Sequence, residues 1–211
     1  MALCLSLLIG VGACSEEEIA YSAGEENKEV ILQLNCQLQT NQEVIVSRAS
    51  TAENRLNDLH FYVFNAAGEL TGYKKLVATE SSPIPTPGPE TVTVKAITGE
   101  AYIYALANLN STIYYLDDAD KNKLTGIDEA DVAGSSLTRD EFLAIDFKRQ
   151  YGNASHIISP NPTDGQFMMS GYLNGGKAVT ITAGTNGAGV ISESNVIRPV
   201  SYTHLTLPTI A

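Results

Sequence analysis

Four oxygen-bearing side chains between residues 118 and 129 have the spacing of a calcium-binding loop. Asp118, Asp120 and Asn122 take the first, third and fifth positions of such a loop, and Glu129 takes the twelfth. The sixth position is Lys123, where the sharp turn of the loop needs a glycine, and no strong helical pattern flanks the segment. The segment is therefore interpreted as an ordinary acidic loop, with calcium binding as the alternative.

The other segments that resemble chemical motifs lack essential residues. The glycine-rich run at residues 184–189 has no lysine and no helix opening behind it, so a tight β-turn is predicted there and not a phosphate-binding loop. His60 lies in a predicted strand and His156 in a predicted loop, without a nucleophile-elbow serine or cysteine and without repeated metal-ligand spacing. The sequence predicts no enzyme activity and no cofactor.

Two pairs of tyrosines are candidates for a sugar-stacking platform. Tyr102 and Tyr104 alternate along one predicted strand, and Tyr114 and Tyr115 are adjacent in the chain. Tyrosine in a strand more often packs against its neighbours with its hydroxyl at the surface, and this is the favoured interpretation.

The bulk composition favours an all-β protein without a nucleic-acid partner. The 211 residues include 10 Tyr, 17 Gly, 8 Pro and no Trp, a composition more typical of strands and turns than of helices. The formal net charge of −11 argues against a DNA or RNA partner, because nucleic-acid binding needs clustered Lys and Arg. Only three cysteines are present, Cys4, Cys14 and Cys36, so no disulfide framework is expected.

The N-terminus has the pattern of a lipoprotein signal. A short apolar run over residues 3–11 precedes Gly12, Ala13 and Cys14, and small residues before a cysteine suit a lipoprotein signal peptidase. We expect residues 1–13 to be the signal peptide and Cys14 to be the lipid anchor; the alternative is a buried strand with an incidental cysteine. No Lys or Arg precedes the apolar run, so the natural start is expected further upstream.

An acidic cluster follows the predicted anchor directly. Ser15, Glu16, Glu17 and Glu18 resemble the signal that exports some Gram-negative lipoproteins to the outer face of the outer membrane. A solvated acidic tether is the alternative interpretation of the same residues. Residues 14–28 are expected to be a tether in either case.

The last twelve residues break the pattern of the chain before them. Residues 200–211 read VSYTHLTLPTIA and resemble translated adapter sequence at the end of an assembled fragment. We expect them to be a non-native tail without a stable place in the fold, and His204 is left out of any site.

The remaining chain reads as short strands joined by turns. Residues 30–38 alternate apolar and polar, and residues 56–65 turn through a glycine into residues 70–78 as a hairpin. The proline-rich residues 81–89 are predicted to be an exposed connection. Further strands are predicted over residues 44–46, 91–97, 101–108, 167–171, 178–183 and 190–198.

One helix is predicted, from a capping box at Thr138 and Glu141 that precedes Phe142 and Leu143. About seven strands with one short crossover helix fit an all-β sandwich over residues 29–199.

Several local patterns together resemble the fimbrillin family, the type V pilin subunits of Gram-negative anaerobes. The resemblance covers most of residues 14–199. It rests on the cysteine of the lipoprotein signal, SRA at 47–49, LNDLHFYVFNAAGEL at 56–70, AYIYALANLN at 101–110, MMSG at 168–171 and NVIRP at 195–199.

The resemblance implies a fold, an assembly route and two processing residues. Fimbrillins have two transthyretin-like Greek-key β-sandwich domains, and a surface protease cuts them after an arginine. The cut removes the first strand, and a donor strand from a neighbouring subunit fills the groove by β-strand addition. Carried over, the strand at 30–38 is the one removed and the cut lies between Arg48 and Ala49, with Arg55 as the alternative arginine. The second domain would lie beyond this sequence.

The resemblance therefore implies a structural pilus subunit, or an anchor or tip component, on the cell surface. Its partners would be other pilin subunits and, through the lipid, the outer membrane. A monomeric surface lipoprotein that binds a glycan or a host protein is the second hypothesis, and a hydrolase is the third, with no supporting residue.

Overall fold

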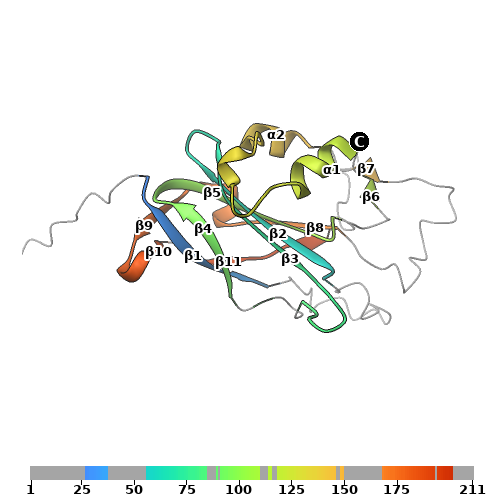
Figure 1. Cartoon of the computed structure of the whole chain (residues 1–211), viewed down its shortest axis with the longest axis horizontal. Coiled ribbons are helices and arrows are strands. Elements are labelled where there is room, and N and C mark those ends of the chain that lie inside the picture. The colour runs from blue at the N-terminus through green and yellow to red at the C-terminus, as the bar shows by residue number, and fades with distance from the viewer. Residues whose placement is uncertain are drawn as a thin grey trace, which may run out of the picture.

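The protein is an all-β sandwich with a small helical layer, as the sequence predicts (Figure 1). The computed structural model describes residues 27–37, 56–84, 89, 91–109, 114–115, 118–145, 148–149, 168–192 and 194–201. The predicted strand at residues 44–46 lies outside these residues.

The described elements are short strands with a few short helices between them. The strands, in chain order, are β1 (Glu29–Cys36), β2 (Asp58–Asn65), β3 (Leu70–Val77), β4 (Val92–Ile97), β5 (Gly99–Ala107), β6 (Tyr114–Tyr115), β7 (Lys148–Arg149), β8 (Met169–Tyr172), β9 (Val179–Ala183), β10 (Ala188–Ile191), β11 (Val196–Ile197) and β12 (Val200–Ser201). The helices are α1 (Asp118–Thr125) and α2 (Arg139–Ala144), with 3-10 turns η1 (Val132–Gly134), η3 (Asn174–Gly176) and η4 (Thr185–Gly187).

Ten of the described strands form one nearly closed mixed sheet. Its main path runs β11-β1-β10-β9-β5-β2-β3, while β4 pairs with the other edge of β1 and β8 joins β5 to β12. The sheet folds over so that β3 approaches β4, and Gly72 of β3 lies against the backbone carbonyl of Lys95. β6 and β7 form a separate two-stranded sheet.

The inner core lies between the two halves of this folded sheet. Alternate residues of each strand point into it, as the period of two requires. Its side chains come from β1, β2, β4, β5, β8, β9 and β11, and include Leu32, Phe61, Val94, Ile103 and Ile181.

A second core lies on the outer face of β2, β3 and β5, under the helices (Figure 1). Tyr62 and Phe64 of β2 and Tyr104 of β5 pack around Phe142 of α2, with ring centroids 4.9 to 5.4 Å apart. Leu124 of α1 is fully buried in the same cluster. β2 is therefore buried on both faces, which explains its continuous apolar sequence.

The predicted hairpin and helix cap are both confirmed. Gly68 takes the positive φ of +82° that the β2–β3 turn needs, and its N–H donates to the carbonyl of Asn65 at 3.0 Å. At α2, Thr138 Oγ1 accepts from Glu141 N at 3.3 Å while Glu141 Oε2 accepts from Thr138 N at 3.1 Å. The carboxylate bonds to Thr138, with the charge of Lys123, hold the pKa of Glu141 below its usual range.

One expectation from the sequence is wrong, and another fails at its first two residues. Residues 118–125 form helix α1 and not an acidic loop. Val200 and Ser201 have a place in the fold, because they form β12 and pair with Ser170 and Met169 of β8. Residues 202–211 lie outside the described residues.

Candidate functional site

The strand β1 is the segment whose placement bears most directly on function. Its sequence alternates, and so does its burial: Val30, Leu32, Leu34 and Cys36 point into the inner core and are at most 1% exposed. On the opposite face, Glu29, Ile31 and Gln33 are exposed. The alternation predicted for residues 30–38 is confirmed over Glu29–Cys36, and Leu38 lies outside the described residues.

β1 is paired along both edges. On one edge it runs antiparallel to β4 over six residue pairs, from Glu29↔Ile97 to Leu34↔Val92. On the other edge it runs parallel to β10 at Ile31 and Leu32, and then parallel to β11 at Asn35 and Cys36. β1 is thus a central strand inserted between segments that are distant in the sequence (Figure 1).

The change of partner from β10 to β11 is held by one side-chain bond and one backbone bond of Asn195. Its Nδ2 donates to the carbonyl of Gln33 at 3.1 Å, and its backbone carbonyl accepts from Asn35 N at 2.9 Å. On the other edge, Cys36 N donates to the carbonyl of Pro89 at 3.2 Å. Backbone bonds of this kind do not depend on the side chains of the inserted strand, so another strand of suitable pattern can make them.

The side chains supply most of the free energy that holds β1. Burial of four apolar side chains is worth about 5 to 10 kcal/mol by the usual transfer values. The charged contact on the outer face adds little, because Lys95 and Glu29 meet at 3.5 Å with both side chains more than half exposed.

Burial also alters the acid–base chemistry of this strand. Cys36 is a free cysteine in the inner core, and burial raises the pKa of its thiol to about 12. Such a thiol is unreactive while β1 is in place, so its reactivity reports departure of the strand.

The predicted processing and anchoring residues lie outside the described part of the chain. These are Cys14, Ser15, Glu16, Glu17, Glu18, Arg48 and Ala49. The structure describes residues 27–37 and resumes at residue 56, so both Arg48 and Arg55 fall in the segment between β1 and β2.

The candidate calcium ligands are not gathered around one point. Asp118, Asp120 and Asn122 belong to helix α1, whereas Glu129 binds β3 through Lys74 Nζ and Lys75 N, each at 2.8 Å. Among the residues that the structure describes, no group of three or more His, Cys, Asp or Glu is placed to hold a metal ion.

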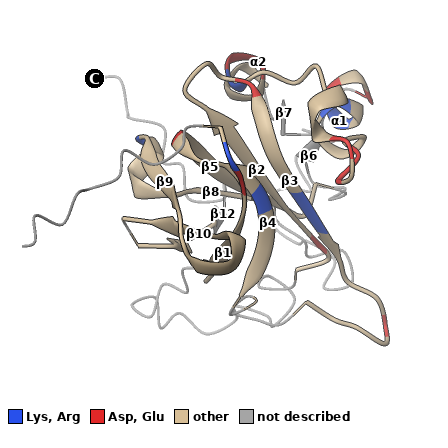
Figure 2. Ribbon diagram, turned by 60° about the vertical axis from the view of Figure 1, so that its left-hand side comes forward, with Lys and Arg blue, Asp and Glu red and all other residues tan. Residues whose placement is uncertain are grey.

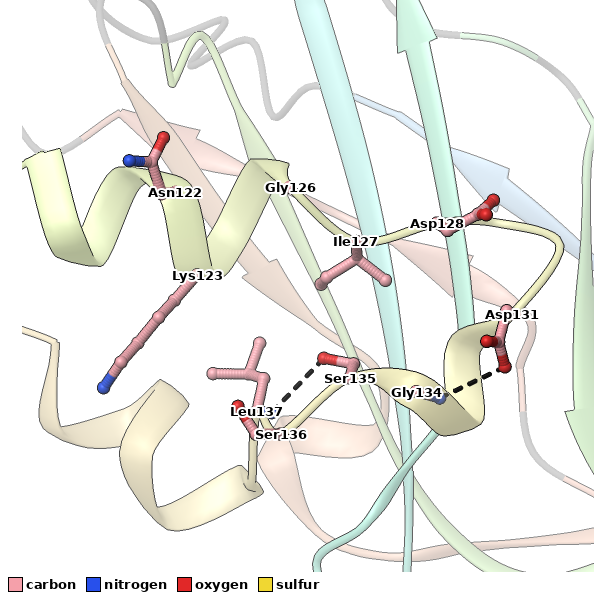
Figure 3. A pocket seen from close by; sticks show the side chains of 10 residues that line it. All are labelled: Asn122, Lys123, Gly126, Ile127, Asp128, Asp131, Gly134, Ser135, Ser136 and Leu137. Atoms are coloured by element: carbon pink, nitrogen blue, oxygen red, sulfur yellow. Dashed lines mark hydrogen bonds between the residues drawn. The ribbon is translucent and has the colours of Figure 1, made fainter.

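A pocket of about 340 Å³ lies where this acidic segment meets η1 (Figure 3). Its polar groups are engaged in local structure: Gly134 N donates to Asp131 Oδ1 and Leu137 N donates to Ser135 Oγ, each at 3.2 Å. The Lys123 side chain extends out toward α2, where its Nζ lies 3.4 Å from Glu141 Oε1. These contacts explain the local turn and do not indicate a ligand.

His60 is the centre of a buried polar group that the sequence did not reveal. The side chains of Asp58, His60 and Tyr73 are nearly or fully buried, and His60 Nδ1 lies 2.8 Å from Tyr73 Oη. His60 Nε2 lies 3.2 Å from Asp58 Oδ1 without an aligned hydrogen bond. Burial, with the charges of Glu129 and Asp58, raises the pKa of Tyr73. Enclosure between β2, β3 and the helices makes this a structural group, out of reach of a substrate.

The tyrosine platform is not formed by Tyr102 and Tyr104. Tyr104 is 6% exposed and packs in the outer core. The guanidinium of Arg139 covers the ring of Tyr102 at 3.8 Å, and Arg139 Nε donates to Tyr104 Oη at 2.9 Å. The two rings serve to anchor α2, as the packing interpretation predicts. Tyr114 and Tyr115 form β6.

Charge and hydropathy add two observations on the described part of the chain. Lys and Arg are spread over β3, β4 and the helices, interleaved with Asp and Glu, instead of forming one basic face (Figure 2). No helix in the described segments is long and apolar enough to cross a membrane.

The chain matches a known protein family over most of its length. The family of the major fimbrial subunit protein (FimA) matches residues 34–201, which is most of the chain and includes the end of β1 and all the described strands after it. No curated protein matches the chain.

Three solved structures are similar to the chain at low identity. The C-terminally truncated tip fimbrial protein of Porphyromonas gingivalis is 14% identical over 82% of this chain and 48% of that one, with a TM-score of 0.46. The fimbrial anchor protein of the same organism is 14% identical over 82% and 50%, with a TM-score of 0.42. A putative polysaccharide binding protein of Bacteroides thetaiotaomicron is 16% identical over 81% and 46%, with a TM-score of 0.44.

The chain spans about half the length of the solved structures that it matches. The family match over residues 34–201 confirms the fimbrillin resemblance of the sequence motifs. The chain therefore belongs to the major fimbrial subunit protein (FimA) family.

Proposed function

We propose that this protein is a structural component of a surface fimbrium, lipid-anchored through Cys14, in which β1 is exchanged for a strand of a neighbouring subunit. The observation that carries the proposal is the geometry of β1 within a chain of the fimbrial family. β1 lies between β4 and β10/β11, buries one row of side chains and exposes the other, and is the first strand of the described chain.

Exchange of a central strand requires a break in the covalent link to the next strand. Hydrolysis of the peptide bond between Arg48 and Ala49 supplies that break, because the cut lies between β1 and β2 and crosses no described strand. After the cut, β1 stays in place through its ladder and its four buried side chains. Its departure leaves unpaired edges on β4, β10 and β11 and an apolar groove, which a strand from another subunit fills.

The anchor and the export signal complete the same route. A diacylated or triacylated Cys14 holds the N-terminal segment in the outer membrane, and the Ser15–Glu18 cluster directs it to the outer face. Cleavage after Arg48 breaks the covalent link between the subunit and its lipid. Because Cys14 and β1 lie on the same fragment, departure of β1 then frees the molecule and opens its groove in one event. Metabolic labelling with a fatty-acid analogue should mark the wild-type chain and not Cys14→Ser, and equal labelling of both would exclude this anchor.

The test of the proposal is limited digestion of the folded chain with an arginine-specific protease. We expect a product that starts at Ala49, with the β1 fragment co-eluting until an excess of a peptide copying residues 29–38 displaces it. Arg48→Lys should abolish this product, whereas Arg55→Lys should leave it unchanged. A peptide of the same composition without apolar alternation is the negative control and should not bind.

Two outcomes contradict strand exchange. In one, Arg48 resists cleavage in the folded protein. In the other, the Ala49 product remains a stable monomer that does not bind the peptide copying residues 29–38. Either result favours the alternative of a monomeric surface lipoprotein that binds a glycan or a host protein.

A further inference from the structure

Gly189 of β10 lies beside β1 on its second edge. It pairs with Leu32 in the parallel β1–β10 ladder and with Ala183 in the antiparallel β10–β9 ladder. A glycine inside a strand costs about 0.5 to 1 kcal/mol relative to alanine, so its presence there calls for a local cause.

The backbone of Gly189 does not supply that cause. The described glycines with positive φ are Gly68, Gly99, Gly175, Gly176 and Gly187, and Gly189 is not among them. An alanine can therefore adopt the backbone conformation of Gly189 without strain.

The space around Gly189 does supply it. A Cβ at this position would lie 2.6 Å from Leu32 Cδ2 and 2.9 Å from Val30 Cγ2, both of which are side-chain atoms of β1. Contacts below 3.0 Å force a shift, and the groups that must shift here are the ends of the Leu32 and Val30 side chains and not the backbone. Gly72 and Gly171 are also crowded, but their nearest neighbours are the backbones of Lys95 and of Pro199. Within the described strands, Gly189 is thus the glycine whose missing side chain makes room for β1 side chains.

We infer that Gly189 determines which strands fit the β1 site, by requiring a bulky apolar side chain at the two positions now held by Val30 and Leu32. The inference rests on the proposed function, because it concerns the strand that replaces β1. A donor strand in the same register meets the same hollow. Small residues at those positions would leave the hollow empty, since the core around it is already close-packed.

The partner strand is defined further by the other positions of β1. Ile31 is 40% exposed and Gln33 is exposed, so the site sets no requirement on the donor side chains at these two positions. The expected occupant is an apolar–polar alternating segment with branched residues two apart, seated beside Gly189, from another subunit of this class.

The first arm of the test uses the intact chain and needs no strand exchange. With Cys4→Ser and Cys14→Ser, Cys36 is the only cysteine, and its rate of labelling by a thiol reagent reports release of β1. Gly189→Ala should raise this rate at least tenfold. Leu32→Ala should also raise it, but Gly189→Ala combined with Leu32→Ala should label no faster than Leu32→Ala alone. If the labelling rate of the double variant instead rises by the product of the two single increases, the inference is overturned.

Gly171→Ala is the matched control, because its Cβ would also be crowded, at 2.8 Å from the backbone N of Pro199. In the double variant with Leu32→Ala, the increase in labelling rate should equal the product of the two single increases. If Gly189→Ala fails to accumulate as folded protein, the yield of folded chain is measured instead of the labelling rate. Adding Leu32→Ala to the same molecule should then restore folded chain, and a failure to do so would overturn the inference.

The second arm measures peptide binding to the chain cut after Arg48 and freed of β1. A peptide copying residues 29–38 should bind roughly 100-fold more tightly than the same peptide with alanine at positions 30 and 32, as expected for loss of buried methylenes. In the Gly189→Ala chain this preference should fall at least tenfold. If no peptide binds either chain, the proposed function fails and the first arm still stands. If peptides bind but Gly189→Ala leaves the preference unchanged, the inference alone is wrong.

Discussion

Replacement of Gly72 by alanine is expected to destabilise the fold more than any other glycine-to-alanine change in the described strands. A Cβ on Gly72 would lie in overlap with the carbonyl oxygen of Lys95 and 3.2 Å from Val63 Cβ. Neither neighbour is a flexible chain end, so β3 and β4 must move apart where the sheet folds over. Overpacking of this kind costs about 3 kcal/mol, and for a chain of this size about 10 °C in melting temperature.

The measurement is thermal and urea unfolding of Gly72→Ala beside Gly187→Ala. Gly187 has a positive φ of +75° and no atom within 4 Å of an added Cβ, so its substitution strains the backbone without a clash. That control should lose about 1 kcal/mol. Equal losses in the two variants would show that β3 and β4 do not meet as closely as Gly72 indicates.

Much of the fold follows from the period of the apolar residues. The alternation in β1 and the turn glycine in the β2–β3 hairpin are local signals, and the structure has both elements at the predicted places. The capping box at Thr138 is equally local and marks the start of α2. The continuous apolar pattern of residues 101–108 indicated a strand buried on both faces, and β5 packs in both cores.

Features that depend on distant neighbours could not be read in this way. Helix α1 has the sequence DADKNKLT with Leu124 as its buried residue, so it lacks the apolar stripe that identifies a helix. It is fixed by tertiary contact, because Tyr62 Oη donates to the carbonyl of Leu124 at 2.9 Å. Its acidic residues match the spacing of calcium-loop ligands, but that spacing alone does not show whether the backbone is a loop or a helix.

The same limit applies to the candidate site. The sequence located β1 but not its partners, because parallel pairing with β10 and β11 joins residues more than 150 positions apart. It treated residues 184–189 as a turn, which η4 bears out at Thr185–Gly187, but the role of Gly189 against Leu32 appears only when the two strands are side by side. The sequence of residues 200–211, which differs from the pattern before it, likewise gives no sign that Val200 pairs with Ser170.

Alkaline pH is expected to weaken the fold through the thiol of Cys36. Burial raises the pKa of this thiol from its ordinary 9.0 to about 12, so the folded chain keeps a proton that the unfolded chain loses. The stabilisation is fully present below pH 9 and is lost as the pH rises toward 12. The slope approaches about 1.4 kcal/mol per pH unit within that window, which amounts to a few kcal/mol in total.

The experiment compares urea unfolding from pH 8 to 11, under reducing conditions, for the Cys4→Ser, Cys14→Ser chain with and without Cys36→Ala. Burial raises the pKa of Tyr62 and Tyr73 as well, but these groups titrate in both proteins and cancel in the difference. Cys36→Ala should be less stable at pH 8, because it leaves a small cavity, and should lose less stability above pH 9.

Cys36 pairs with Ile197 of β11 at the end of β1 that leads toward Arg48, so the thiolate should open this end of the strand first. Faster release of the β1 fragment from the cut chain at pH 10 than at pH 8, abolished by Cys36→Ala, would show this directly. Parallel pH curves for the two proteins would mean that the thiol is already accessible in the folded chain, and that Cys36 does not hold the strand.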